Sequence, residues 1–302
     1  MANSNIIRSP LFYVGDKYKL INEIKLYFPP IINRLIEPFV GGGSVFLNVD
    51  ANSYLLNDID RIVIDLHGYL CSKSMNPHLF IEELLQKIRL YGLSCSYMEN
   101  VIPKEIKKEY VKTYYAIYNK DNYLKIRDIY NNSTDRPIDL LFLLKIYGFN
   151  RMHRFNKNHE FNVPVGNVDF NKNVVDALIN YFLSVQKKKI AWYCLDFKDF
   201  LDSISFQEND LVYLDPPYLI TFSEYNKLWN EQTEEELLVM LDNLNRQNIK
   251  FAISNVTHYK GRINELFLEW SKKYNCHEIK SNYISYHDNS IKSFKEVLIT
   301  NY

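Results

Sequence analysis

The spacing of apolar residues indicates an open α/β sheet near the start of the chain. Short apolar runs begin at Leu35 and at Ser53, and the helix-capable segment 61–70 follows the second run. Strand-sized runs that alternate with helical segments predict a βαβ unit. The first run leads into glycines and another helix-capable segment, which predicts a strand, a tight turn and a helix.

The pattern changes between residues 75 and 170. This part holds long, charge-rich stretches with helical periodicity and then a loop-like segment at 147–170. Strand-like runs return afterwards, with a helical stretch at 233–247 between two of them. These runs are 190–196, 210–215, 249–255 and 296–300. A parallel α/β sheet interrupted by a mainly helical insertion is the simplest interpretation.

Composition is that of a folded globular chain. Of 302 residues, 47% are hydrophobic, and the four cysteines include no Cys-x-x-Cys pair. This spacing argues against zinc and against a disulfide framework, and it favours a reducing cytoplasm. Apolar runs stay far below the roughly 20 residues of a membrane helix. The histidines lack companions at ligand spacing, so we expect no metal site. Net charge is zero, so any surface for nucleic acid must be local.

Gly41, Gly42 and Gly43 join the first predicted strand to its helix. Glycine permits positive φ and close approach of the backbone to a ligand. The turn is not a phosphate loop, because no Gly-Lys-Ser/Thr follows, and the GxGxxG pattern fails at Phe46. Asp58 ends the next strand, where Rossmann-like sites bind ribose hydroxyls. Two interpretations of this segment therefore remain. It either binds an adenosine cofactor that has no pyrophosphate, or it is a turn that needs glycine only for packing.

The run 210–215 ends in Asp215-Pro216-Pro217-Tyr218. Ligands of open α/β sheets bind beyond the carboxyl ends of strands, so Asp215 should face the crevice. The prolines remove two amide donors, so the backbone carbonyls near Asp215 are left as acceptors without competing N–H groups. The ring of Tyr218 can lie flat on a planar ligand. A carboxylate of ordinary pKa accepts hydrogen bonds from an aromatic amine better than it abstracts a proton. The alternative is a proline turn with an exposed capping Asp.

An aromatic amine such as that of adenine suits this arrangement. Two acceptors that hold its hydrogens favour a more tetrahedral nitrogen with an available lone pair. Attack on a sulfonium methyl would follow in line, with orientation as the main source of rate gain. The chain has no Pro-Cys nucleophile motif, which argues against methylation of cytosine C5.

These motifs together resemble the Dam family of DNA adenine methyltransferases, especially its phage-type members. The resemblance rests on the order of three segments, 12–17, 37–45 and 215–218, and it extends over nearly the whole chain. It implies a mostly parallel, Rossmann-like methyltransferase sheet of seven strands with a mainly helical target-recognition insertion. The implied domains are an S-adenosylmethionine-binding catalytic domain at 1–75 and 171–302 and a DNA target-recognition domain at 76–170.

The resemblance also implies roles for matching residues. The catalytic residues would be Asp215, Pro216, Pro217 and Tyr218. The cofactor-binding residues would be Tyr13, Lys17, Phe39, Gly41, Gly43, Asp58, Asp196, Phe197 and Asp215. The DNA-binding residues would be Phe149, Asn150, Met152, Arg154, Asn156, Pro164 and Tyr225. Tyr218 and Tyr225 would stack on the target base.

The segment 145–159 adds a local basic strip to the insertion. It holds Lys145, Arg151, Arg154 and Lys157 without an acidic residue, interleaved with aromatics. Such a strip favours phosphate neutralisation and base contact, and we expect Arg154 to read a guanine. A solvated charged loop is the alternative. Relatives usually carry a basic residue beyond their Pro-x-Gly turn, whereas this chain continues as PVGNV, which weakens the case for their usual GATC target.

The sequence thus predicts a site-specific DNA adenine N6-methyltransferase that flips its target base and acts on a short duplex site, with GATC as the candidate. We expect it in the cytoplasm of a bacterial or phage-infected cell, with a cognate restriction endonuclease as a functional counterpart and no membrane partner. The alternatives are methylation of cytosine N4 or of RNA, and a catalytically silent DNA-binding regulator. An NAD-dependent oxidoreductase is disfavoured by the broken glycine pattern. The segment 283–299 should form a hairpin or a loop before the last strand.

Overall fold

The computed structural model describes residues 6–98, 102–221, 229–280 and 294–302. The chain forms two compact units. Unit 1 comprises 1–6, 17–64 and 188–302, and unit 2 comprises 7–16 and 65–187. These boundaries are set by packing, and they differ from the domain boundaries expected from the sequence. The assignment of cofactor binding to one part and DNA recognition to the other stays a prediction.

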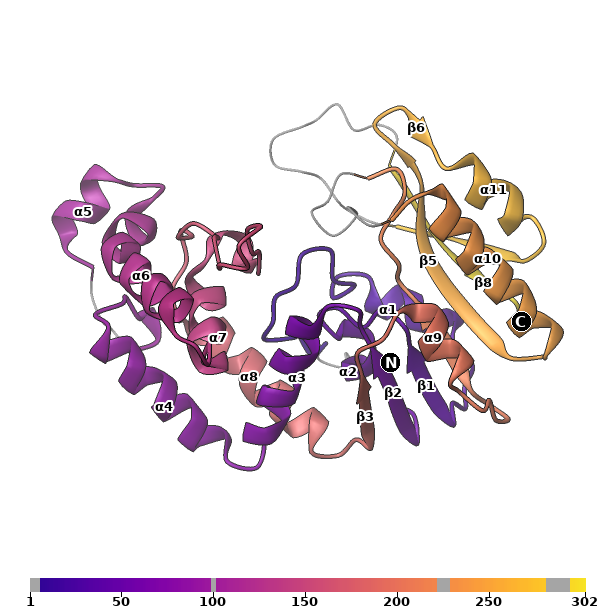
Figure 1. Cartoon of the computed structure of the whole chain (residues 1–302), viewed down its shortest axis with the longest axis horizontal. Coiled ribbons are helices and arrows are strands. Elements are labelled where there is room, and N and C mark those ends of the chain that lie inside the picture. The colour runs from indigo at the N-terminus through magenta and orange to yellow at the C-terminus, as the bar shows by residue number, and fades with distance from the viewer. Residues whose placement is uncertain (1–5, 99–101, 222–228, 281–293) are drawn as a thin grey trace. The chain divides into compact units, whose positions relative to one another are not determined.

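Within the described residues, unit 1 is built on a sheet of eight strands (Figure 1). Seven follow the order β3-β2-β1-β4-β5-β8-β7, and the short β6 pairs with β5. The strands are β1 (Arg34–Glu37), β2 (Ser53–Asn57), β3 (Ile190–Tyr193), β4 (Leu211–Leu214), β5 (Lys250–Tyr259), β6 (Arg262–Ile263), β7 (Asn275–Ile279) and β8 (Lys295–Thr300). From β3 to β5 all pairings are parallel, whereas β8 runs antiparallel to β5 and β7. The predicted mostly parallel, Rossmann-like sheet of seven strands is confirmed.

Parallel pairing brings the ends of the central strands to one edge. Leu35 of β1 pairs with Tyr54 of β2 and with Leu211 of β4. The carboxyl ends of β1, β2 and β4 therefore lie side by side, and the polar residues that follow them share that edge. In an open sheet this edge is where ligands bind.

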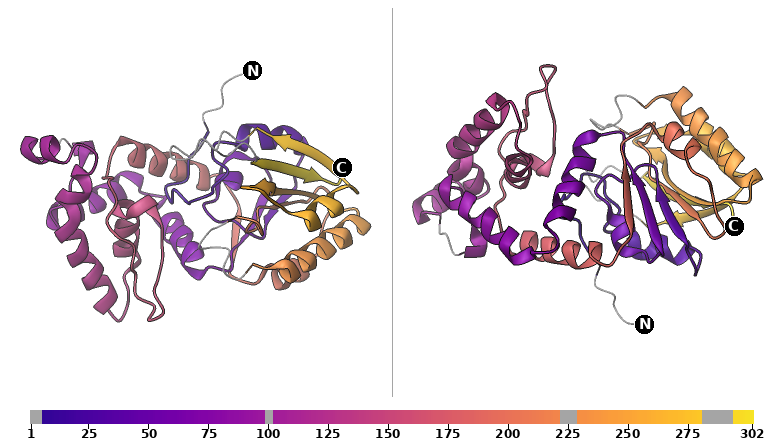
Figure 2. Two further views of the ribbon diagram at one scale, coloured as in Figure 1. Left: turned by 90° about the horizontal axis from the view of Figure 1, so that it is seen from above. Right: turned by 60° about the horizontal axis from the view of Figure 1, so that its bottom comes forward.

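Short helices surround the sheet. In unit 1 they are α1 (Ile21–Ile24), α2 (Ser44–Asn48), α9 (Phe197–Asp202), α10 (Glu231–Arg246) and α11 (Glu265–Ser271), with a 3₁₀ turn at Lys25–Tyr27. Figures 1 and 2 show α10 and α11 beside β5. One apolar cluster joins α9, α10 and α11 to the strands, with Leu241 and Phe267 packed in the same core as Val212 and Ile253. The predicted helical stretch at 233–247 lies almost wholly within α10.

Unit 2 is mainly helical, as predicted. Its helices are α4 (Pro77–Leu90), α5 (Lys104–Glu109), α6 (Tyr114–Asn132), α7 (Ile138–Tyr147) and α8 (Lys172–Val185), with 3₁₀ turns at Ser96–Met98 and Phe149–Arg151. Helix α3 (Arg61–Lys73) begins in unit 1 and continues into unit 2. Every residue of α7 from Leu140 to Tyr147 is buried, which is typical of a helix that is apolar on all sides.

Two further sequence predictions concern membrane spans and the segment 283–299. No helix within these ranges is long and apolar enough to span a membrane. The hairpin or loop expected at 283–299 falls largely on residues 281–293, which lie outside the described ranges, and its last part forms the beginning of β8.

Candidate active site

Asp215 directly follows β4, and all four residues of that strand are buried. The side chain of Asp215 is 20% exposed, in contrast to the strand that precedes it. The buried strand therefore delivers a carboxylate to the carboxyl edge of the sheet, which is the position that the apolar pattern predicts.

Three side chains of unit 1 gather around Asp215, and two of them, Lys17 and Glu296, come from distant parts of the sequence. The ammonium of Lys17 lies 2.7 Å from Asp215 Oδ2 and 3.6 Å from Glu296 Oε1. The Tyr218 hydroxyl donates to Asp215 Oδ1 at 2.8 Å and lies within 3.3 Å of Glu296 Oε1. Lys17 Nζ is also 5.1 Å from the centre of the Tyr218 ring. We call Lys17, Asp215, Tyr218 and Glu296 the carboxylate–lysine cluster.

One donor from a distant segment and one from the same tetrapeptide thus reach the acceptors of Asp215. The prolines remove the local amide donors, but Lys17 occupies Oδ2 and the Tyr218 hydroxyl occupies Oδ1. An ionised carboxylate offers about four lone-pair sites, so Asp215 can still accept hydrogen bonds from an amine.

Burial raises the pKa of two members of this cluster, Glu296 and Tyr218. It raises the pKa of Glu296, and the charge of Asp215 adds to this, whereas Lys17 and the Tyr218 hydroxyl lower that pKa. Burial and the two carboxylates hold the pKa of Tyr218 well above its ordinary value, so its hydroxyl stays protonated and donates. The second oxygen of Glu296, Oε2, is buried without a hydrogen-bond partner among the described residues. Glu296 is not predicted from the sequence; its only signal there is one carboxylate at the start of the apolar run EVLIT.

The glycine turn has the backbone that its composition predicts. Gly41 and Gly43 adopt φ values of 47° and 79°, in the left-handed region that favours glycine. Gly43 caps α2, and its N–H donates to the carbonyl of Val40 at 2.8 Å. The Gly41 N–H donates to Asp58 Oδ2 at 2.9 Å. The turn and the end of β2 are therefore joined, as a shared ligand site requires.

The carboxyl group of Asp58 has a raised pKa. Burial raises the pKa of Asp58 to about 6, although hydrogen bonds from the N–H groups of Asp60 and Gly41 lower it. Its charge therefore changes in a range close to neutral pH.

Asn57 holds the ends of three strands together. Its amide donates to the carbonyls of Pro38 and Leu195, both at 3.0 Å, and its oxygen accepts from the Leu195 N–H at 2.9 Å. The residue is fully buried. No role is predicted for Asn57 from the sequence; an amide at the buried end of a strand, next to Asp58, is the available signal.

Aromatic rings form one wall beside these strand ends. Phe39 and Phe197 pack with ring centres 5.4 Å apart, and Trp229 lies 5.7 and 5.8 Å from the two rings. Asp196 precedes this wall as the cap of α9, accepting from the Lys198 N–H at 2.9 Å. Trp229, which is not predicted from the sequence, is fixed by a 2.6 Å hydrogen bond from its indole N–H to Glu234.

Glu37 adds another carboxyl to this edge, and it too is not predicted from the sequence. It is 2% exposed, and burial followed by the charge of Asp215 raises its pKa well above the ordinary value. Its Oε1 has no hydrogen-bond partner within the described ranges. The edge of unit 1 is therefore rich in carboxyl groups, with the ammonium of Lys17 set among them.

Tyr13 belongs to unit 2, unlike Lys17 of the same predicted motif. Its ring centre lies 5.7 Å from that of His153, and the Lys145 ammonium is 5.8 Å from the Tyr13 ring.

The predicted DNA-contacting residues Phe149, Asn150 and Pro164 share one part of unit 2. The Phe149 N–H donates to the Pro164 carbonyl at 2.8 Å, and Phe149 is 51% exposed. Gly166 makes this approach possible, because a Cβ there would lie 2.6 Å from the carbonyl oxygen of Gly148. Asn150 is exposed and has a φ of 52°. The 3₁₀ turn Phe149–Arg151, held against the Pro-x-Gly turn, therefore presents an aromatic ring and an amide to solvent.

Arg154 and Asn156 lie in the loop between these segments. The loop doubles back on itself, with Phe155 bridged to Phe161 (Figure 2). The Arg154 guanidinium donates to Asn162 twice, to Oδ1 at 2.9 Å and to the carbonyl at 3.1 Å. Asn156 bonds to Glu160 through its amide at 2.7 Å, and Met152 is half-buried. Asn162 therefore fixes the direction of the side chain that we expect to read a guanine.

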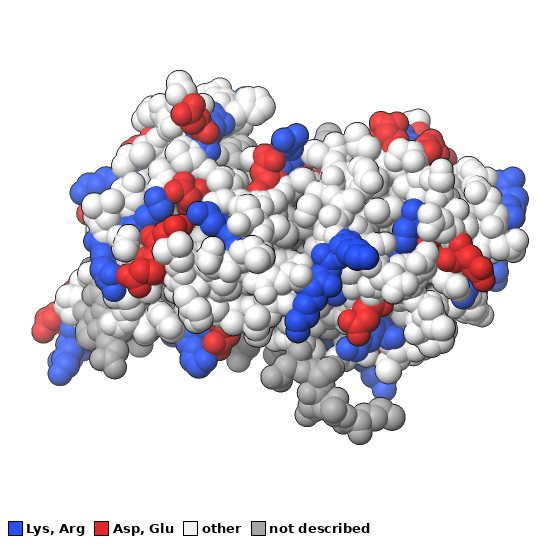
Figure 3. Space-filling view, turned by 90° about the horizontal axis from the view of Figure 1, so that it is seen from below, with Lys and Arg blue, Asp and Glu red and all other residues white. Residues whose placement is uncertain are grey.

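The predicted basic strip is wrong for Lys145. Lys145 is 2% exposed, because α7 is buried on all sides, and its ammonium donates to the Arg151 carbonyl at 2.6 Å. The Arg151 guanidinium lies 3.7 Å from the ring centre of Phe12, and burial lowers its pKa to about 10. Lys157 is exposed and Arg154 half-buried. On the face in Figure 3, positive and negative side chains are interspersed.

Two further predictions can be placed briefly. Tyr225 falls in the segment 222–228, outside the described ranges. Within those ranges, no group of His, Cys, Asp and Glu has an arrangement suited to a metal ion.

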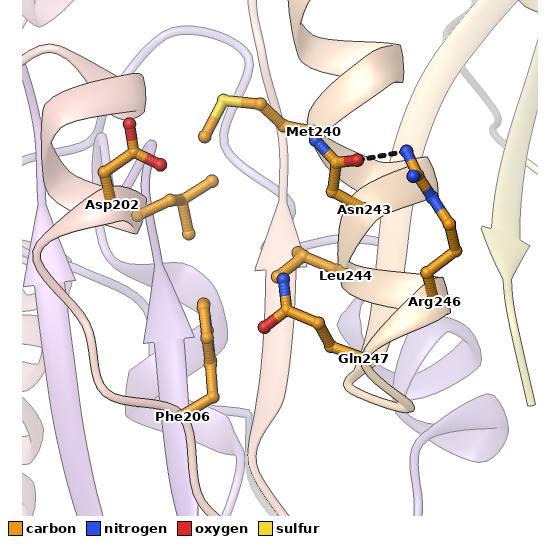
Figure 4. Close-up of a pocket in the computed structure, with 8 residues that line it drawn as sticks. Asp202, Phe206, Met240, Asn243, Leu244, Arg246 and Gln247 are labelled. Atoms are coloured by element: carbon orange, nitrogen blue, oxygen red, sulfur yellow. Dashed lines mark hydrogen bonds between the residues drawn. The ribbon is translucent and has the colours of Figure 1, made fainter.

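A cavity of about 270 Å³ lies between α9 and α10 (Figure 4). Its lining residues are Leu201, Asp202, Phe206, Met240, Asn243, Leu244, Arg246 and Gln247, and Arg246 donates to Asn243 on the same helix. None of these lining residues is a predicted site residue. The carboxyl edge of the sheet remains the better candidate.

Comparison with known proteins adds independent information. The family model described as D12 class N6 adenine-specific DNA methyltransferase matches residues 13–284. The chain is 37% identical over 308 residues to Type II methyltransferase M.FokI of Planomicrobium okeanokoites, covering 99% of this chain and 43% of the relative. It is 36% identical to Modification methylase StsI of Streptococcus sanguinis, covering 100% and 44%, and 28% identical to DNA adenine methylase of Escherichia coli K12, covering 90% and 87%. The chain thus spans less than half the length of the first two relatives.

Proposed function

Because the chain belongs to the D12 class N6 adenine-specific DNA methyltransferases, we propose that it transfers a methyl group from S-adenosylmethionine to N6 of adenine in duplex DNA. The observation that carries the proposal is Asp215-Pro216-Pro217-Tyr218 at the carboxyl end of β4, in the same unit as the glycine turn. An acceptor at this edge, beside a turn that permits close backbone approach, suits an amine target and an adenosine cofactor.

The residues of unit 1 fit S-adenosylmethionine. This cofactor carries a sulfonium, an ammonium and two ribose hydroxyls, and Glu37 and Glu296 each have a buried oxygen without a partner in the described part of the chain. We propose that Asp58 binds the ribose hydroxyls, that Gly41 and Gly43 admit the cofactor, and that Phe39, Asp196 and Phe197 hold its adenine. Lys17 would bind its carboxylate end, and Tyr13 is a further proposed contact. When bound, the cofactor supplies an electrophilic methyl group.

The catalytic residues would act by orientation. Asp215 and the carbonyls held by Pro216 and Pro217 would accept the two hydrogens of the target amine, and the lone pair of the amine would then face the methyl group. Tyr218 would stack on the extruded base, with Tyr225 as the proposed second stacking residue. A flipped base must leave its stack at a cost of a few kcal/mol, so such contacts are needed.

Recognition of DNA is assigned to unit 2. Phe149, Asn150, Met152, Arg154, Asn156 and Pro164 are the proposed contacts. Arginine pairs well with guanine in the major groove, and an exposed aromatic ring such as Phe149 can fill a vacated stack. GATC is the candidate target. Duplex DNA of a bacterial or phage-infected cell is cytoplasmic, so the proposed site of action is the cytoplasm, and a cognate restriction endonuclease is the proposed functional counterpart.

A transfer assay tests the proposal. Purified chain, labelled S-adenosylmethionine and a mixed-sequence duplex should give labelled DNA, and Asp215→Ala should reduce the rate about 100-fold or more. Asp202→Ala is the matched control, because Asp202 is an exposed carboxylate at the end of α9. Sequencing the methylated duplex identifies the target and tests GATC. Absence of label in DNA with the wild-type chain would refute the proposed function.

A further inference from the structure

Glu296 is a buried carboxylate to which the proposed function gives no role in the methyl-transfer step. It lies on β8, where pairing with Val256 of β5 and Ile279 of β7 fixes its backbone. The side chain is 2% exposed, and its Oε2 has no partner in the described ranges. A buried carboxylate that is not fully paired costs several kcal/mol, so the fold alone gives no reason to keep one here.

The groups around Glu296 come from three parts of unit 1. Lys17 lies before α1, Asp215 and Tyr218 follow β4, and Tyr213 lies within β4. The Tyr218 hydroxyl stands between the two carboxylates, 2.8 Å from Asp215 Oδ1 and 3.3 Å from Glu296 Oε1. The two carboxylates share one neighbouring ammonium, that of Lys17. The phenol of Tyr218 therefore links the carboxylate of Asp215 with the more deeply buried carboxylate of Glu296.

Methyl transfer to an amine leaves one proton to be removed. The sulfonium C–S bond breaks as the N–C bond forms, and the electron pair of the broken bond stays on sulfur. The nitrogen then has three bonds beyond its bond to the ring and carries a positive charge, so it must release a proton to a base. Asp215 is the first base in reach, but as a neutral acid it would be a weaker acceptor for the next target amine.

On the basis of the proposed function, we propose that Glu296 receives this proton through the hydroxyl of Tyr218. The amine gives its proton to Asp215 Oδ1, and Asp215 passes it to the Tyr218 oxygen as the Tyr218 hydroxyl proton moves to Glu296 Oε1. One proton moves from the amine to Glu296, and Asp215 and Tyr218 regain their starting states. Glu296 is thus a positioning residue, because it acts through Tyr218 and does not touch the substrate.

The raised pKa of Glu296 suits a proton acceptor, and it sets the direction of the pH dependence. A protonated Glu296 accepts nothing, so the wild-type single-turnover rate, measured with S-adenosylmethionine saturating at every pH, should fall as the pH falls through the pKa of Glu296. In Glu296→Gln we expect a rate lowered about 10-fold or more and no such acid limb. Tyr218→Phe keeps the ring and removes the bridge, so the double variant should be no slower than the slower single variant.

Glu234→Gln is the matched control. Glu234 is another fully buried carboxylate of unit 1 with a raised pKa, and it accepts hydrogen bonds from Trp229, Asn255 and Asn264. This variant should lower the melting temperature and keep the acid limb. Glu296→Gln must differ from it in the pH profile, which a purely structural role would not change.

A second readout needs no turnover. In carbon-13 NMR of the cofactor-free chain, one of the glutamate carboxyl signals that titrate above the ordinary range should disappear in Glu296→Gln and shift in Tyr218→Phe. The inference is overturned if Glu296→Gln keeps the wild-type acid limb, or if its rate loss is fully explained by weaker cofactor binding measured by calorimetry. A wild-type chain that methylates no DNA would instead refute the proposed function, and this inference with it.

Discussion

The ammonium of Lys17 lies 2.7 Å from Oδ2 of Asp215, although 198 positions separate the two residues in the sequence. This ion pair joins the N-terminal motif to the residue that we propose holds the target amine. Lys17 is 3% exposed, so the pair is largely shielded from water on its cationic side. Loss of one partner from a buried pair typically costs about 3–5 kcal/mol, because the other charge is left without a partner.

Lys17→Met should therefore lower the free energy of unfolding, and more so at high pH. Without the ammonium, the pKa of Glu296 rises further above its unfolded value. A carboxyl whose folded pKa is raised destabilises the fold above that pKa, and the penalty disappears as the pH falls. We expect a larger difference from wild type at about pH 8 than at about pH 5 in urea unfolding. Lys198→Met, which removes an exposed ion pair with Glu236, should have little effect at either pH.

Cofactor affinity should depend on the protonation of Asp58. With a pKa of about 6, Asp58 loses its charge as the pH falls below neutrality, and its capacity to accept two ribose hydroxyls falls with it. Calorimetric affinity for S-adenosylmethionine should weaken below about pH 6 in the wild type. Asp58→Asn should bind about 10-fold or more weakly, without this pH dependence. Asp60→Asn should keep the dependence with a lower midpoint, since the charge of Asp60 raises the pKa of Asp58. A wild-type affinity that stays constant across this range would contradict the prediction.

Two glycines of unit 2 should respond in opposite directions to alanine. In Gly166→Ala the added Cβ would lie 2.6 Å from the Gly148 carbonyl oxygen, which forces the Pro-x-Gly turn apart. We expect a loss of about 1–3 kcal/mol of stability. Gly68 lies in α3 with open space where a Cβ would stand, so Gly68→Ala should stabilise by about 0.5–1 kcal/mol. Thermal unfolding of both variants checks the pair; equal shifts would show that the close approach does not matter.

Arg154 and Lys157 should differ in what they contribute to DNA binding. Arg154→Ala should cost about 1–3 kcal/mol on the cognate duplex and relax the preference for one base. Asn162→Ala should reproduce part of this loss, because Asn162 orients the guanidinium. Lys157→Ala should weaken binding to all duplexes alike and reduce the salt slope by about 1. Titrations at several salt concentrations separate the two effects. An Arg154→Ala variant that loses affinity equally for every sequence would assign this arginine to phosphate instead.

The sequence predicts those parts of the fold that repeat a local pattern. The apolar runs around Leu35, Ser53 and Leu211 have strand length and end in polar residues, so the parallel strands and the position of Asp215 follow from them. β7 was not predicted, because Asn275, Cys276 and Glu278 are exposed and give an edge strand no apolar alternation.

Site residues could be predicted only where neighbouring residues in the sequence together form a recognisable motif. The glycine turn and the DPPY tetrapeptide do so. Glu296 and Trp229 acquire their roles from neighbours far away in the chain, and no spacing within the sequence reports these contacts. Lys145 shows the converse: its charge suggests a surface, but the apolar residues on every side of it in α7 place it in the interior.

Nucleoside analysis of treated DNA tests the central claim most directly. A duplex incubated with the chain and S-adenosylmethionine is digested to nucleosides, which are separated and identified by mass spectrometry, with Asp215→Ala treated in parallel. The account predicts N6-methyldeoxyadenosine with the wild-type chain and none with the variant. N4-methyldeoxycytidine in its place, methylation confined to RNA, or no methylated nucleoside would contradict it.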